Sequence, residues 1–139
     1  MRNSIKILFA LLPMCLVGSC ENWRETAGDI AGMWQLTEWR DASNNVIATK
    51  EAGLYYCFQL NLLKFQVANQ GEHHLSYYTH THDSLFLGKT IYWPGDSVCQ
   101  HSDLAKFGVP ADGRLRIDVL NDDKLQLSSA QGTLLFRRY

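Results

Sequence analysis

Three runs of alternating apolar and polar residues constrain the fold more than any other feature of this sequence. The runs lie at residues 114–120, 124–127 and 133–137. Asn-Asp-Asp at 121–123 and Ala-Gln-Gly at 130–132 separate them. Alternation with a period of two places successive side chains on opposite faces of a strand, and turns about every ten residues are typical of antiparallel all-β proteins. The pattern therefore predicts a three-stranded antiparallel meander within an all-β domain.

Further short strands are predicted upstream of the meander. Trp34 and Leu36 alternate with polar neighbours, and alternation returns over residues 75–82. Residues 85–87 and 90–93 predict two more brief strands, the second ended by Pro-Gly at 94–95. Val-Ile-Ala at 46–48 predicts a short return strand. Helical structure is expected only as one turn over residues 102–107, capped by Ser102 and ended at Gly108.

Residues 54–67 are the most apolar part of the domain, and their alternation changes parity once. The apolar positions are even-numbered from Leu54 to Leu62 and odd-numbered from Leu63 to Val67. A change of parity indicates either a bulge or bend within one long strand, or a tight turn near Asn61. Both alternatives are compatible with an all-β domain.

The first segment has the layout of a secretory signal. Arg2 and Lys6 give it a positive start, and residues 7–17 are apolar apart from Pro13. This run is shorter than the roughly 20 apolar residues that a membrane-spanning helix needs. It ends Val-Gly-Ser-Cys at 17–20, which resembles a bacterial lipobox, where the cysteine sulfur is acylated and cleavage falls just before it. The alternative is an ordinary cysteine that follows an apolar run.

The lipobox resemblance implies a division of the chain into a signal peptide at 1–19, a lipidated tether at 20–29 and a folded domain at 30–139. It also implies that lipid on Cys20 is the attachment to a membrane. The expected location is the cell envelope, at the outer membrane, on its periplasmic or surface face.

Length and charge exclude some classes of function. Removing residues 1–19 from the 139-residue chain leaves 120 residues, the size of one domain. Removing Arg2 and Lys6 from the 13 basic residues leaves 11, against 14 acidic residues, so the net charge is −3 with histidine neutral. The sequence has no basic patch and no interleaving of aromatic and basic residues. Nucleic acid is therefore not an expected partner.

Two cysteines remain in the expected domain, Cys57 and Cys99. An even number of cysteines in an oxidising compartment is compatible with a disulfide bond between them. The alternative is two separate buried thiols, because a free cysteine behaves as a small apolar residue. The sequence leaves both alternatives open.

Gly32-Met33-Trp34 resembles the G-x-W motif that opens the first barrel strand of the lipocalin-like superfamily, in its small bacterial lipoprotein form. Arg137 and Arg138 in the last predicted strand resemble the basic position that this family places over that tryptophan. The resemblance implies an antiparallel up-and-down barrel of about eight to ten short strands, squat or partly open. It implies closure by a cation–π contact between Trp34 and one of the two arginines. Closure of the barrel removes the exposed edges of the sheet.

Catalytic and metal-binding residues are not predicted. His74, His80 and His82 share one parity, and with Asp83 or His101 they would resemble a zinc site, but the ligand set is incomplete. His82, Asp83 and Ser84 are consecutive, so on a strand they point to alternate faces and do not form a triad. The sequence has no nucleophile elbow and no phosphate-binding loop. We expect a non-enzymatic protein with no cofactor.

Several aromatic residues are candidates for lining a ligand pocket in the barrel: Tyr56, Phe58, Tyr78, Tyr92 and Trp93. Their rings would contact a small, partly apolar ligand, and their hydroxyl groups would orient it. The alternative is that these side chains fill the core, because eight-stranded barrels are at the size where either outcome occurs. A filled barrel would favour an accessory module that binds an envelope protein, unknown in identity, through an outer face or through loops such as residues 92–101.

Overall fold

The structure, a computed structural model, describes residues 28–139, so the predicted signal peptide and Cys20 lie outside the described residues. Within the described part, ten strands and three short 3-10 helices follow one another. They are η1 Gly28–Ile30, β1 Gly32–Arg40, β2 Val46–Thr49, η2 Lys50–Ala52, β3 Leu54–Gln59, β4 Leu62–Val67, β5 His73–His80, β6 Ser84–Trp93, β7 Val98–Cys99, η3 His101–Phe107, β8 Arg114–Leu120, β9 Lys124–Ser129 and β10 Gly132–Arg138.

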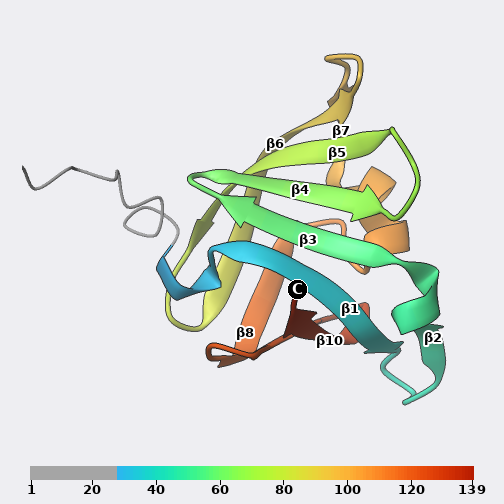
Figure 1. The fold of residues 1–139 in the computed structure, drawn as a ribbon, viewed down its shortest axis with the longest axis vertical. Helices are drawn as coiled ribbons and strands as arrows, with labels where there is room; N and C mark the ends of the chain where they lie inside the picture. Colours follow the sequence, from blue (N-terminus) through green and yellow to red (C-terminus); the bar gives the residue numbers. More distant parts are fainter. Residues whose placement is uncertain (1–27) are drawn as a thin grey trace, which may run out of the picture.

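All described strands belong to one antiparallel sheet, and eight of them form a ring in the order β1-β3-β4-β5-β6-β8-β9-β10. The ring closes because β10 pairs with β1 from Trp34 opposite Arg138 to Arg40 opposite Thr133. The two strands outside the ring are β2, which pairs with the second half of β1, and β7, which pairs with β6. Figure 1 shows β1, β3, β4 and β5 following one another, with β8 on the far side. The prediction of an all-β, lipocalin-like barrel, partly open, is confirmed.

The ring is weakest between β6 and β8, and η3 lies beside this junction. The two strands pair over Ser84 to Phe86, whereas β5 and β6 pair along most of their length. Register shifts interrupt the β1–β10, β5–β6 and β8–β9 pairings. Such shifts bend strands and increase their twist, which a closed sheet requires.

The change of parity within residues 54–67 is a tight turn and not a bulge. Gln59 ends β3 and pairs with Leu62 at the start of β4, so Leu60 and Asn61 form the turn. Leu60 has a φ of 55°, in the left-handed region. A two-residue turn of an antiparallel pair commonly needs a positive φ, which a leucine adopts only where the flanking strands impose it.

Two predicted local boundaries are corrected. Residues 85–87 and 90–93 form one continuous strand, β6. Gly88 and Lys89 form a bulge between them, which shifts the pairing register with β5 but does not end the strand. The helical turn begins at His101, and its cap is Gln100 and not Ser102. The backbone N–H of Gln100 donates to Asp103 Oδ2 at 2.8 Å, and Gly108 ends the turn with a φ of 80°.

Candidate functional site

Trp34 and Arg138 form the closure of the ring. The Arg138 guanidinium lies 4.1 Å from the centroid of the Trp34 ring. The same side chain donates to three backbone carbonyls, those of Ala31 at 2.6 Å, Asp29 at 3.0 Å and Asp122 at 2.6 Å. The indole Nε1–H of Trp34 donates to the Ile30 carbonyl at 2.8 Å. Arg138 therefore joins η1, the first strand and the β8–β9 turn at one point.

The structure places Arg137 elsewhere, on the outer face of β10. Its Nε donates to Gln35 Oε1 at 2.7 Å, and Gln35 Nε2 donates to the Tyr55 hydroxyl at 3.1 Å. Gly32, the first residue of the G-x-W motif, has a φ of 122° and lies against Arg138, so a Cβ at this position would be 2.7 Å from Arg138 Nη1. The absence of a side chain at Gly32 gives Arg138 its path to the Trp34 ring.

The interior of the ring is filled by side chains. Tyr56, Phe58 and Tyr78 are among the candidate pocket residues, and all three are buried in one core. Their rings contact each other and their neighbours, with Tyr56 at 4.7 Å from Phe65 and Phe58 at 5.1 Å from Tyr78 between centroids. The Tyr56 hydroxyl donates to the Phe107 carbonyl at 2.5 Å, which attaches η3 to β3. These three residues therefore belong to the packed core of the ring.

The other two candidate pocket residues, Tyr92 and Trp93, lie at the far end of β6 and point to different sides. Tyr92 faces inward, with its ring 5.4 Å from that of His74. Trp93 faces outward, is 47% exposed and stacks on His73 at 6.0 Å. Adjacent residues of a strand point to opposite faces, so Tyr92 and Trp93 do not line one pocket.

A polar patch lies on the inner face of β5 and β6, beside η3. Ser76 and Thr90 are fully buried, and the Thr90 hydroxyl donates to Ser76 Oγ at 3.0 Å. His74 is 8% exposed, and its Nδ1 is a buried atom with no hydrogen-bond partner among the described residues. Burial and the charge of Lys106 lower the pKa of His74, so its ring is neutral at pH 7. A buried polar atom without a partner costs free energy, which makes this patch notable.

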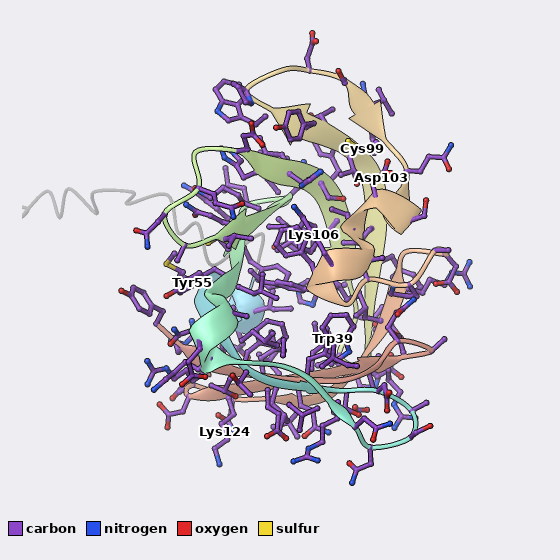
Figure 2. All side chains as sticks on the ribbon, turned by 90° about the vertical axis from the view of Figure 1, so that its right-hand side faces the viewer. Trp39, Tyr55, Cys99, Asp103, Lys106 and Lys124 are labelled. Carbon is purple, nitrogen blue, oxygen red and sulfur yellow. The ribbon has the colours of Figure 1, made fainter. Side chains whose placement is uncertain are left out.

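Charged groups of η3 and a thiol of β7 lie on the side of the molecule that carries this patch. Figure 2 shows Cys99 on β7 together with Asp103 and Lys106 on η3, on one side of the molecule. The pKa of the Cys99 thiol is raised by burial and by the Asp103 charge, so the thiol stays protonated near neutral pH. A protonated thiol is a weak nucleophile, and the arrangement gives no sign of a reactive cysteine.

Cys57 and Cys99 are both free thiols in the structure, so the disulfide alternative is not realised. Cys57 on β3 pairs with Lys64 and faces outward, whereas Cys99 on β7 pairs with the inward-facing Thr90. Three strands lie between them, and adjacent strands are about 4.8 Å apart. This separation is far beyond the roughly 7 Å between Cα atoms that a disulfide bond spans.

The histidines of the metal hypothesis do not converge. His74 faces the interior of the ring, while His82 lies in the β5–β6 turn with its side chain 93% exposed. His101 belongs to η3, where its Nε2 lies 2.8 Å from the Gly88 carbonyl oxygen. Among residues 28–139, no three His, Cys, Asp or Glu side chains are grouped to hold a metal ion. No helix in this same range is both long and apolar enough to cross a membrane.

Three hollows of the described surface lie over the strands of the ring. One of about 790 Å³ is lined by β6, β8 and the loop before β8, and includes Phe86 and Arg114. A second of about 600 Å³ lies over β1, β8, β9 and β10, and a third of about 360 Å³ lies over β3, β4 and Leu75 of β5. These three hollows are candidate binding surfaces.

Sequence reasoning missed the outer apolar residues of β5, β6 and β7. Leu75, Ile91 and Val98 are consecutive cross-strand neighbours on the outer face. Val98 is 68% exposed, and the adjacent Tyr77 is 51% exposed. The alternation grouped Leu75 with Tyr77, but it does not say which group faces the core. The buried group turns out to contain His74 and Ser76, the less apolar choice.

A family model described as a lipocalin-like domain matches residues 14–139. The fold is similar to the crystal structure of a lipocalin-like protein from Bacteroides uniformis ATCC 8492, with a TM-score of 0.58 and 20% identity over 81% of this chain and 100% of that one. It is also similar to an uncharacterized protein from Bacteroides eggerthii DSM 20697, with a TM-score of 0.53 and 21% identity over 78% of this chain and 98% of that one.

No curated protein sequence matches this chain significantly. At these identities the two crystal structures show the fold alone. The match of the family model covers most of the sequence, and it agrees with the closed sheet and with the Trp34–Arg138 contact. This chain belongs to the lipocalin-like domain family.

Proposed function

We propose that this protein is a lipid-anchored accessory protein of the cell envelope that works without catalysis and acts through its outer surface. A lipocalin-like fold suggests either ligand binding or an accessory role. The observation that favours the accessory role is the filled interior, in which Tyr56, Phe58 and Tyr78 belong to one buried core. The outer face of β5–β7, in contrast, carries exposed apolar side chains. The lipobox resemblance at Cys20 supports the anchor.

Native mass spectrometry of the chain purified from its own host tests the filled interior. We expect the mass of the processed chain with no stoichiometric small molecule, because the inward-facing aromatic side chains pack together in one buried core. A small molecule that stays bound through purification in non-denaturing buffer would contradict the accessory role and support a carrier.

Replacing Cys20 by alanine tests the anchor separately. The expected result is loss of the acyl mass and transfer of the chain from the membrane fraction to another fraction, because the thiol is the acceptor of the lipid. The matched control is Cys99→Ala, which leaves the lipobox intact and should leave the membrane fraction unchanged. Equal partition of the Cys20→Ala variant and the parent chain would refute the anchor.

A second candidate function is binding of a small ligand at the polar patch beside η3, and the unpartnered His74 Nδ1 favours it. A ligand with a hydroxyl or carboxylic acid group would supply the missing hydrogen bond, with Ser76 and Thr90 nearby on β5 and β6. The same mass spectrometry on His74→Phe discriminates the two candidates. A molecule bound to the parent chain and lost from this variant would favour the ligand at this patch.

A further inference from the structure

We propose that the outer face of β3–β7 lies flat on the phospholipid surface to which Cys20 attaches the chain. This inference rests on the anchor of the proposed function and adds to it the orientation of the domain. It follows from three independent properties of this face: its row of apolar side chains, its lack of carboxylates, and its position beside the point where the chain enters the domain.

The apolar row runs straight across the face. The register places Cys57 of β3 beside Lys64 of β4, then Leu75 of β5, Ile91 of β6 and Val98 of β7. Residues directly opposite each other on neighbouring strands have Cβ atoms about 5 Å apart, so Leu75, Ile91 and Val98 form a contiguous apolar run. Lys64 separates this run from Cys57. Contiguous apolar surface on the outside of a domain marks a place of contact with another body.

Aromatic residues flank the row on both sides. Tyr77, 51% exposed, lies one pair further along β5, and Trp93, 47% exposed, ends β6. The Trp93 ring stacks on His73, which holds it against the sheet. Leu60, in the β3–β4 turn, is 45% exposed and lines the hollow of about 360 Å³ on this face. Tryptophan and tyrosine are the side chains most enriched at the level of lipid headgroups.

The charges of this face fit an anionic surface. Within the described chain, β3 to β7 contain no Asp or Glu, although the chain as a whole has 14 acidic and 13 basic residues. The outward charges of these strands are Lys64 and the exposed Lys89. The acidic residues on this side, Glu72, Asp83 and Asp96, lie in the turns between the strands. A lysine held close to an anionic bilayer is attracted to the negative charge of the lipid headgroups.

The opposite side of the ring has a different distribution of charged side chains. β1, β8, β9 and β10 carry charges of both signs on their outer faces. These charged residues are Glu38, Arg40, Arg114, Arg116, Asp118, Lys124 and Arg137. Two ion pairs form among these residues, Arg40 with Glu38 and Arg116 with Asp118. A surface of mixed, paired charges is typical of exposure to water, so the two sides of this ring suit two different surroundings.

The entry of the chain lies at one edge of the apolar face. Met33, the second residue of β1, pairs with Cys57, so it continues the apolar row by one strand. Cys20 precedes Gly28, the first described residue, by eight positions. Eight residues span at most about 28 Å when fully extended. The row from Met33 to Val98 crosses five strand spacings, about 24 Å. An anchor at Cys20 therefore keeps Gly28 within about 28 Å of the membrane surface. This distance is similar to the width of the face.

A second copy of the chain fits the face less well than a bilayer does. A two-fold interface brings the same patch of both subunits together. Such an interface would bring Lys64 and Lys89 of one copy near those of the other, with no carboxylate in the strands of either face to compensate. An anionic lipid surface would neutralise the positive charge of the same lysines. The charges of this face therefore favour a bilayer over a second copy.

Quenching of tryptophan fluorescence by lipids brominated in their acyl chains tests this orientation. The lipidated chain is reconstituted into vesicles of phosphatidylethanolamine and phosphatidylglycerol, and its quenching is compared with that of Trp93→Phe, which removes the probe from the face. In the matched variant Trp93→Phe/Leu135→Trp, the probe is moved to the outer face of β10. We expect the quenched fraction of the emission to be larger in the parent chain than in either variant.

Charge reversal gives a second readout. Lys64→Glu/Lys89→Glu should lose the quenching that is specific to Trp93, whereas Lys50→Glu/Lys124→Glu changes the net charge equally and should retain it. Retained quenching in the first variant would overturn the role of the lysines and with it the choice of an anionic surface.

The outcomes separate this inference from the proposed function. Mass spectrometry that finds no acyl group on Cys20 overturns the anchor, and the orientation with it. Lipidated chain in which Trp93 is quenched no more than the probe on β10 overturns the orientation alone. A Trp93 emission shift that depends on protein concentration in the absence of lipid, with a matching dimer in sedimentation, would assign the face to a second copy and overturn the bilayer.

Discussion

Arg137 and Arg138 are adjacent in the sequence and have different environments in the structure. Arg138 covers the Trp34 ring and donates to three carbonyls, whereas Arg137 donates to Gln35 on the outer face. Strand alternation alone requires them to differ, but the sequence does not say which of the two faces the closure. The pairing of Trp34 in β1 with Arg138 in β10 determines that Arg138, and not Arg137, faces the closure.

We expect Arg138→Ala to lower the free energy of unfolding by about 2–4 kcal/mol, because it removes three charge-assisted hydrogen bonds and a cation–π contact. Arg137→Ala is the matched control, and its loss should be below about 1 kcal/mol because only the Gln35 contact is removed. Urea denaturation of both variants measures the difference. Equal losses would show that Arg138 has no special part in closing the ring.

His74 makes the stability of the domain depend on pH. Burial and Lys106 lower the pKa of His74, so its folded pKa is below its value in the unfolded chain. The unfolded chain then binds a proton that the folded chain does not, and stability is lost as the pH falls below about 6.5. His73 has a pKa lowered in the same direction, which adds to the effect.

Replacing His74 by phenylalanine should flatten this dependence. We expect the melting temperature of the parent chain to fall between about pH 7 and pH 5, and that of His74→Phe to fall less over the same interval. His82→Ala, in which an exposed side chain is removed, should keep the slope of the parent chain. An unchanged slope in His74→Phe would mean that the ring is charged in the folded state.

At the scale of elements, η3 closes one end of the ring through few contacts. Leu104 and Phe107 are its buried side chains, and Tyr56 donates to the Phe107 carbonyl. The phenol of Tyr56 is buried, which raises its pKa, so it remains a hydrogen-bond donor. Apart from these contacts, η3 is attached through His101, whose Nε2 lies 2.8 Å from the Gly88 carbonyl oxygen. An element attached by two apolar side chains and two side-chain contacts to backbone carbonyls opens more readily than the strands beneath it.

Tyr56→Phe should therefore loosen η3. Without the hydroxyl, the Phe107 carbonyl is left buried without its donor, which costs about 1–3 kcal/mol. Hydrogen exchange should become faster at the amides of residues 104–109 and remain unchanged in β9. Tyr78→Phe is the control, since its hydroxyl donates to the Leu60 carbonyl and not to η3. Faster exchange over the whole domain would indicate global destabilisation in place of local opening.

The strands were predictable where one face is apolar and the other polar. β8, β9 and β10 follow the alternation of residues 114–137 closely, because each pairs with neighbours that bury one side. β3 and β4 were less clear, since the two-residue turn at Leu60 and Asn61 carries no glycine, and the sequence left a bulge and a tight turn near Asn61 as alternatives. β7 could not be predicted from the sequence, because a strand of two residues is too short to show an alternating pattern.

The candidate site was less predictable than the fold. Alternation sorts residues into two groups but does not assign either group to the core. On β5 the buried group contains His74 and Ser76, and the exposed group contains Leu75 and Tyr77. This inversion hides the apolar outer face from a sequence argument. On β3, by contrast, the candidate pocket residues Tyr56 and Phe58 do face inward, where they are buried in the core.

At the scale of the whole molecule, the two thiols lie on opposite faces with three strands between them. We expect a reducing agent to leave the melting temperature within about one degree of its value without reductant, because no cross-link constrains the unfolded chain. A disulfide bond closing this loop would contribute about 3–4 kcal/mol. Differential scanning calorimetry with and without dithiothreitol measures the effect, and a drop of several degrees on reduction would contradict the separation of the thiols.

The pairing of β10 with β1 joins residues about 100 positions apart, with Trp34 opposite Arg138. Proteins dominated by such distant pairings fold slowly, in milliseconds to seconds, because a long loop must be ordered before the contact forms. Until β10 arrives, β1 offers an unpaired edge to any neighbouring chain. The interval between synthesis of the first strand and of the last is therefore the period in which this protein depends most on being kept apart from other copies.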